Sequence, residues 1–130
     1  MIPFLDELLA LDLPPGSFAI FGSGPLAVRG WREAKDVDII VRRSVWDELA
    51  KEYPRNVNGK GLQVSHIELF ADWEPWFEDA DMLIDTAEII EGLPFVRLEH
   101  VVAWKKAMGR EKDLKDIELI DSHGGPTASI

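Results

Sequence analysis

Two acidic residues separated by one apolar residue stand out among the side chains that could do chemistry. Asp36 and Asp38 flank Val37 and lead into the apolar run 39–41. Alternate residues of a strand share a face, so two steps of about 3.3 Å place these carboxylates roughly 6–7 Å apart. Carboxylate oxygens are hard ligands suited to Mg²⁺, and two carboxylates with no cation beside them repel each other. The pair predicts a magnesium site, with two solvated aspartates at a strand end as the alternative.

A glycine-rich turn precedes this pair. Gly22-Ser23-Gly24 follows the apolar run 18–21, which favours a strand that enters a tight turn. Glycine lets a backbone approach a ligand closely, and exposed N–H groups at such a turn favour phosphate. The Ser23 hydroxyl adds another donor. By itself the turn is an ordinary connector, but beside the paired aspartates it predicts a phosphate-binding turn.

A third carboxylate is needed to hold two metal ions, and Glu68 is the candidate. Its two neighbours in the sequence are apolar and face the other way in a strand. Glu68 would point toward the aspartate pair if strands 37–41 and 62–70 are neighbours. The alternatives are a solvent-facing glutamate at this position and Asp72 as the third ligand.

Three basic residues are candidates for contact with phosphate. Arg29 can meet a triphosphate, or it can cap local carbonyls and pair with Glu33. Lys105 and Arg110 belong to the C-terminal helical region and can neutralise phosphate charge. The alternative for Lys105 and Arg110 is a solvated helix face.

The elements that must position these residues alternate between strand and helix patterns. Residues 18–21, 37–41 and 62–70 predict strands, and residues 87–97 predict a hairpin around a Gly-Leu-Pro turn. Helices are predicted over 3–11, 44–53, 98–108 and 112–121, with a loop over 56–61 and a short helix or acidic loop over 73–81. We therefore expect one α/β (α+β) domain over residues 1–130, with a small mixed β-sheet flanked by helices and a C-terminal helical pair.

Composition removes several classes of function. With 46% hydrophobic and 29% charged residues, the chain is neither disordered nor fibrous. It has no cysteine, which excludes disulfides, a thiol nucleophile and cysteine-based zinc sites. No apolar run is long enough for a membrane span, and the N-terminus lacks a signal-peptide pattern, so a cytoplasmic location is expected.

The formal net charge of −10 limits the choice of partner. Electrostatic binding to a long nucleic acid needs a net positive charge. Residues 71–92 contain eight acidic residues and no Lys, Arg or His. This stretch predicts either a solvated acidic face or a surface for a basic protein partner.

The spacing of the turn and the aspartates resembles the nucleotidyltransferase superfamily shared with polymerase beta. Gly22-Ser23, Arg29-Gly30 and Asp36-Val37-Asp38 follow its pattern of a strand, a Gly-Ser turn, a short helix and a strand with Asp-x-Asp. The segment 98–116, with its Lys-Lys, Gly-Arg and Lys-Asp-Leu sequences, is similar to the helical end of small stand-alone bacterial members. Two features depart from the pattern: the inserted segment 24–28, and Glu68 where aspartate is commoner.

This resemblance implies Mg²⁺-dependent transfer of a nucleoside monophosphate from a nucleoside triphosphate (NTP) to an acceptor hydroxyl. Gly22 and Ser23 would hold the terminal phosphates, with Asp36 and Asp38 on Mg²⁺. Glu68 would hold a second ion and help to deprotonate the acceptor, whose identity stays open. Two alternatives are a catalytically weak or inactive protein that acts as an antitoxin-like partner-binding module, and a generic α/β domain with a structural Asp-Val-Asp.

Overall fold

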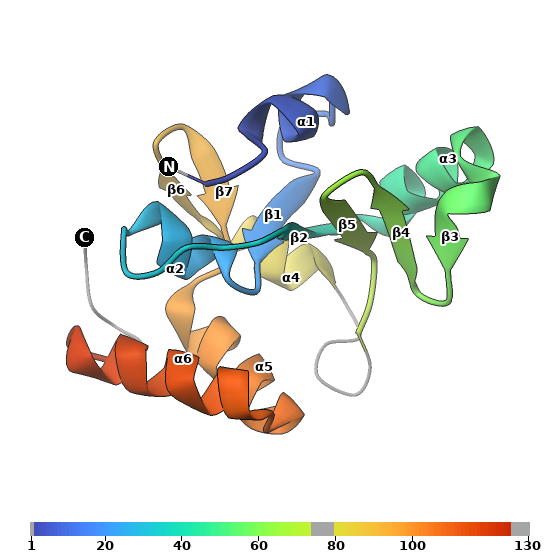
Figure 1. Ribbon diagram of the computed structural model, residues 1–130. Helices are drawn as coiled ribbons and strands as arrows, with labels where there is room; N and C mark the ends of the chain where they lie inside the picture. The colour runs from blue at the N-terminus through green and yellow to red at the C-terminus, as the bar shows by residue number, and fades with distance from the viewer. Residues whose placement is uncertain (1, 74–79, 126–130) are drawn as a thin grey trace.

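A mixed β-sheet forms the centre of the molecule in the computed structural model, which describes residues 2–73 and 80–125 (Figure 1). Within these residues, seven strands lie in the order β3-β4-β5-β2-β1-β7-β6. Their bounds are β1 Phe18–Phe21, β2 Val37–Val41, β3 Val57–Asn58, β4 Gly61–Val64, β5 Ile67–Phe70, β6 Glu88–Ile90 and β7 Leu93–Phe95. β2 runs antiparallel to β1 and parallel to β5, while β1 runs parallel to β7.

Helices cover both faces of this sheet (Figure 1). Their bounds are α1 Leu5–Ala10, α2 Gly24–Val28, α3 Arg43–Glu52, α4 Ala80–Asp85, α5 Leu98–Met108 and α6 Glu111–Ser122. Ile20, Ile39 and Leu69 face one side of the sheet and pack in one buried cluster with residues of α1 and α3. Phe21, Ile40 and Phe70 face the other side, in a cluster with residues of α4, α5 and α6. The alternation of apolar side chains along β1, β2 and β5 therefore divides the core into two layers.

The predicted fold class is confirmed, and one predicted element is wrong. Residues 62–70 form a hairpin of β4 and β5 rather than a single strand, with Val64 opposite Ile67. The turn depends on Ser65, which adopts a left-handed backbone conformation with φ 55°. The predicted loop 56–61 contains the short strand β3. The prediction for 73–81 falls largely outside the described residues.

The C-terminal helical pair is joined by a two-residue turn. Gly109 ends α5 in the left-handed conformation that glycine adopts at low cost, with φ 64°. Arg110 caps α6 together with Asp113, whose side chain accepts hydrogen bonds from both the backbone and the guanidinium of Arg110. The turn therefore brings the last residues of α5 beside the first turns of α6.

None of the helices described in residues 2–73 and 80–125 is long and apolar enough to cross a membrane.

Candidate functional site

Two of the three acidic residues are direct neighbours across the sheet. β2 and β5 are adjacent parallel strands, as the sequence analysis required, and Asp38 lies opposite Glu68 in their register. Paired residues on neighbouring strands point to the same face. Asp36 lies immediately before β2, two residues before Asp38. The three side chains therefore share the sheet face that α5 and α6 cover.

The acidic residues oppose one another's ionisation. Burial raises the pKa of Asp38 to about 7, with further contributions from the charges of Asp36 and Glu68. Burial also raises the pKa of Glu68, followed by the charge of Asp36. In the described parts of the chain, no group donates a hydrogen bond or forms an ion pair with any of these three carboxylates. Neighbouring carboxylates that form no ion pair within the described residues are suited to an external cation.

Two glycines show which way the paired carboxylates lean. A Cβ on Gly22, in the turn after β1, would lie 2.8 Å from Asp38 Oδ2. A Cβ on Gly61, at the start of β4, would lie 3.1 Å from Glu68 Oε2. β1 and β4 flank the β2–β5 pair on opposite sides, so the two carboxylates lean apart. Accordingly, no three His, Cys, Asp or Glu side chains in residues 2–73 and 80–125 are grouped closely enough to hold a metal ion as they stand.

Replacing Gly22 by alanine should disturb both the backbone and Asp38. Gly22 has φ +70°, and Gly30 has φ +76° with no atom within 4 Å of an added Cβ. Gly30→Ala should cost about 1–2 kcal/mol from backbone strain alone. Gly22→Ala should cost the same and also displace the Asp38 carboxylate. We expect thermal unfolding to shift in both variants and Mg²⁺-dependent nucleotide binding to weaken in Gly22→Ala only; equal binding in the two would contradict this role of Gly22.

A cavity of about 300 Å³ lies between the acidic residues and the C-terminal helices. Gly22 and Ser23 form one end of it, and Asp36 and Asp38 contribute carboxylates. The remaining lining residues are Arg32, Lys35, Trp104, Lys105, Arg110, Lys112, Asp113 and Asp116. Five basic side chains thus share the cavity with four acidic ones. Glu68 is not among the lining residues.

Three basic residues of the cavity, Arg32, Lys105 and Arg110, are engaged with buried aspartates. Lys105 Nζ lies 2.8 Å from Asp116 Oδ2 and 3.8 Å from Asp113 Oδ1, and its side chain is 3% exposed. Arg32 donates a 2.6 Å hydrogen bond to the other oxygen of Asp116. Arg110 pairs with Asp113 at 2.6 Å. The sequence-predicted Lys105 and Arg110 therefore reach the cavity, each held by an aspartate.

Two lysines that the sequence analysis did not single out also line the cavity. Lys35 and Lys112 are exposed and form no ion pair with any residue that the structure describes. The positive charge of Lys112 also favours the ionised form of Asp38. The signals in the sequence were the position of Lys35 beside Asp36 and that of Lys112 just after the Gly-Arg turn.

Ser23 is available for a ligand. Its carbonyl accepts hydrogen bonds from the first turn of α2. Within the described residues, nothing accepts a hydrogen bond from its N–H or its hydroxyl. Ser23 lines the cavity, so two of its donors are available there without a partner among the described residues.

Arg29 and Asp72 lie away from this cavity. Arg29 is ion-paired with Glu88, its side chain is 1% exposed, and it donates a 2.7 Å hydrogen bond to the carbonyl of Pro25. The carbonyl-capping alternative describes it, although its partner is Glu88 and not Glu33. Asp72 pairs with Arg43 and with Lys60 at 2.7 Å, and the hydrogen bond from Lys60 is the main cause of its lowered pKa.

Residues of the acidic stretch pair with basic residues of the same chain. Arg42 binds both Asp81 and Asp85, at 2.8 and 2.5 Å. Glu88 and Asp72 are paired as described above. These contacts place four acidic residues of the stretch in ion pairs within the chain, while Glu74, Glu78 and Asp79 lie outside the described residues.

The mixed seven-strand sheet with its flanking helices and C-terminal helix pair matches a solved structure of nucleotidyltransferase fold. A crystal structure from Thermotoga maritima, of a protein described as a "putative nucleotidyltransferase", matches it with a TM-score of 0.59 and 18% sequence identity. The match covers 91% of this chain and 93% of the other. No protein-family model and no curated protein matches the sequence. At 18% identity the likeness establishes the fold of the chain and nothing further.

Proposed function

We propose that this protein is a Mg²⁺-dependent nucleotidyltransferase that moves a nucleoside monophosphate from an NTP to an acceptor hydroxyl. The observation that carries the proposal is the set of three carboxylates without protein partners, beside the free donors of Ser23 and a cavity rich in basic side chains. Such an arrangement suits a ligand that brings a cation and phosphates together.

The donor set on the sheet fits magnesium. Asp36 and Asp38 both line the cavity and would hold the ion, since carboxylate oxygens are the ligands that it prefers. When bound, Mg²⁺ would neutralise phosphate charge and make the acceptor hydroxyl easier to deprotonate. Glu68 is the third candidate ligand, and its recruitment requires its side chain to turn from Gly61 toward Asp38.

The phosphates of the donor would lie beside the carboxylates, within the same cavity. Ser23 would donate from its N–H and hydroxyl, while Lys35 and Lys112 would supply unpaired positive charge. Lys105 and Arg110 are already neutralised by aspartates, so they would contribute hydrogen bonds and shape more than net charge. Arg29 takes no part in this proposal.

Apart from the chemistry that Mg²⁺ would supply, the transfer step uses groups of the substrates and the carboxylates. The acceptor oxygen forms a bond to the α-phosphorus, while the bond from that phosphorus to the pyrophosphate oxygen breaks. Glu68 would accept the hydroxyl proton, because its raised pKa makes it a better base than an ordinary glutamate. Holding the two reactants in line lowers the entropic part of the barrier.

Mg²⁺ and ATP together should stabilise the protein. A ligand at about 100 times its dissociation constant adds roughly 2.7 kcal/mol to the free energy of unfolding, which raises Tm by roughly 10 °C in a domain of this size. The measurement is thermal unfolding with Mg²⁺ and ATP, with Mg²⁺ alone and ATP with a chelator as controls. A shift caused equally by ATP with the chelator would contradict a metal-dependent site.

Turnover is tested with α-labelled NTP, Mg²⁺ and a cell extract as the source of acceptor. Label on an acceptor, with pyrophosphate released, supports transfer. Free phosphate as the only product would indicate hydrolysis. Binding without turnover would favour the inactive, partner-binding alternative.

A further inference from the structure

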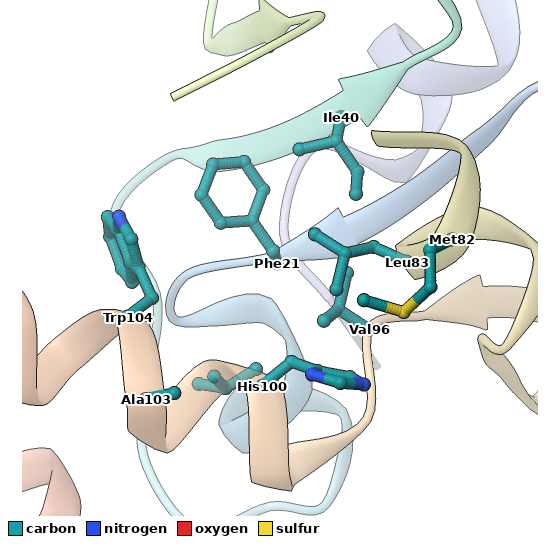
Figure 2. Close-up of a pocket in the computed structure, with 9 residues that line it drawn as sticks. Phe21, Ile40, Met82, Leu83, Val96, His100, Ala103 and Trp104 are labelled. Carbon is teal, nitrogen blue, oxygen red and sulfur yellow. The ribbon is translucent and has the colours of Figure 1, made fainter. Parts of the chain in front are cut away.

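A second, largely apolar cavity shares the lining residue Trp104 with the charged one, and Figure 2 shows its lining. It has a volume of about 120 Å³ and lies between the sheet and helices α4 and α5. Phe21 and Ile40 form its floor on the sheet, and Leu83 and Val96 extend its apolar wall. Apart from His100, the residues that line it are apolar or aromatic. Such a lining selects an apolar group in a ligand.

The size of the cavity selects a single ring. A protein cavity of about 150 Å³ with a similar aliphatic and aromatic lining stays dry and binds benzene. A six-membered ring is therefore close to the limit at about 120 Å³, and a purine with two fused rings exceeds it. A pyrimidine base would leave most of its polar groups without partners, because among the described residues of the lining only His100 and the indole N–H of Trp104 offer polar atoms on side chains. An aromatic hydrocarbon ring fits better than a nucleobase.

The two cavities share a wall at Trp104, which lines both. Phe21 lies opposite Asp38 in the sheet register, and Ile40 follows Asp38 by two residues on the same face. That spacing places the floor of the apolar cavity roughly 6–7 Å from Asp38 along the strand. A hydroxyl on a ring above Ile40 would cover about half of this distance toward the carboxylates.

Trp104 also carries an unanswered hydrogen-bond donor at this boundary. The residue is 8% exposed, and its Nε1–H has no acceptor among the residues that the structure describes. A buried donor without a partner costs about 1–3 kcal/mol. An oxygen atom of a ligand within hydrogen-bond distance of Nε1 would satisfy it.

We infer that the apolar cavity binds the ring of the acceptor, and that the acceptor is a small single-ring aromatic molecule with a hydroxyl group, of the phenol or benzyl alcohol class. The role of this molecule as an acceptor rests on the proposed transfer reaction. The affinity of the cavity for such a ring does not depend on that reaction. In the reaction, the ring hydroxyl would be the oxygen that bonds to the α-phosphorus, with pyrophosphate as the leaving group and the proton passing to Glu68.

Binding of phenol tests the cavity without nucleotide. Ala103 lines the cavity from α5 and has an exposed side chain, so Ala103→Leu should fill the space without harm to the core. Ala107 is an exposed alanine one turn further along α5 that lines neither cavity, which makes Ala107→Leu the matched control. We expect the Kd for phenol, measured by ligand-observed NMR, to rise at least fivefold in Ala103→Leu and to stay unchanged in Ala107→Leu. An absence of binding to the wild type, or equal binding to all three proteins, overturns the inference.

A second measurement tests the assignment of this ring as the acceptor. The protein is incubated with Mg²⁺, α-labelled ATP and either phenol or benzyl alcohol, and the products are separated. Label on the aromatic compound, lost in Ala103→Leu and kept in Ala107→Leu, is the expected result. If Mg²⁺ and ATP stabilise the protein and an extract supports transfer, but neither aromatic compound accepts label, the acceptor assignment is overturned while the proposed function stands. If Mg²⁺ and ATP do not bind, the proposed function fails, and the phenol measurement still decides the cavity.

Discussion

Asp38→Asn should make the ligand-free protein more stable at pH 8 and abolish its response to Mg²⁺ and ATP. The pKa of Asp38 is raised to about 7 by burial and by two neighbouring carboxylates. Ionising it at neutral pH therefore costs stability, and asparagine removes that cost while keeping the shape. We expect a gain of about 2 kcal/mol at pH 8, less than the full pKa shift would give because the half-buried group is partly hydrated.

The stability gain of Asp38→Asn should depend on pH, because the pKa of Asp38 is raised in the folded state. A carboxyl whose pKa is higher in the folded state binds protons more readily there, so the stability of the wild type falls as pH rises from about 4 to 7. The asparagine variant lacks this slope. The gain in the free energy of unfolding should thus be small at pH 5 and widen toward pH 8, as measured by denaturant titration.

Asp47→Asn is the control for Asp38→Asn. Asp47 is exposed on α3, and its pair with Arg43 is long, at 3.9 Å. Its replacement should change stability by less than about 0.5 kcal/mol at either pH and leave the shift with Mg²⁺ and ATP intact. A destabilised Asp38→Asn at pH 8 would show that the carboxylate has a structural partner and is not held for an external cation.

Asp116→Ala should be among the most damaging single changes in the chain. Asp116 is buried and accepts hydrogen bonds from both Lys105 and Arg32. Removing it leaves the Lys105 ammonium, with a side chain 3% exposed, 3.8 Å from Asp113 as its nearest remaining carboxylate. Loss of one partner of a buried pair typically costs about 3–5 kcal/mol, so Tm should fall by roughly 10 °C or more.

The exposed pair on the same helix provides the comparison. Glu111 and Lys115 are both strongly exposed and 3.4 Å apart, and such pairs contribute at most about 0.5 kcal/mol. Glu111→Ala should leave Tm within a few degrees of the wild type. Similar losses in Glu111→Ala and Asp116→Ala would mean that the buried network does not determine the effect.

The strands nearest the site could be predicted because their sequences carry strong local signals. Apolar runs end at a Gly-Ser-Gly turn after β1 and begin at an Asp-Val-Asp sequence in β2, and a glycine separates α5 from α6. The turn between β4 and β5 carries no such signal. Ser65 and His66 are neither glycine nor proline, and the left-handed conformation of Ser65 is fixed by pairing across the hairpin.

The site was predictable only as far as strand periodicity reaches. Placing Glu68 on the same face as Asp38 follows from alternation and from the pairing of β2 with β5. The partners of the basic residues depend on contacts between distant segments. Arg29 meets Glu88 across 59 residues, and Arg32 meets Asp116 across 84. No local pattern in the sequence distinguishes an arginine that binds phosphate from one that binds a distant carboxylate.

The strands at the two edges of the sheet, β3 and β6, are short. β3 has two residues and β6 has three, so each presents few backbone N–H and carbonyl groups to another molecule. Pairing of native sheets edge to edge is a common start for aggregation, and short outer strands oppose it. Concentrated solutions of the folded protein should therefore not form fibrils. On heating, aggregation should follow the unfolding of the core and not precede it.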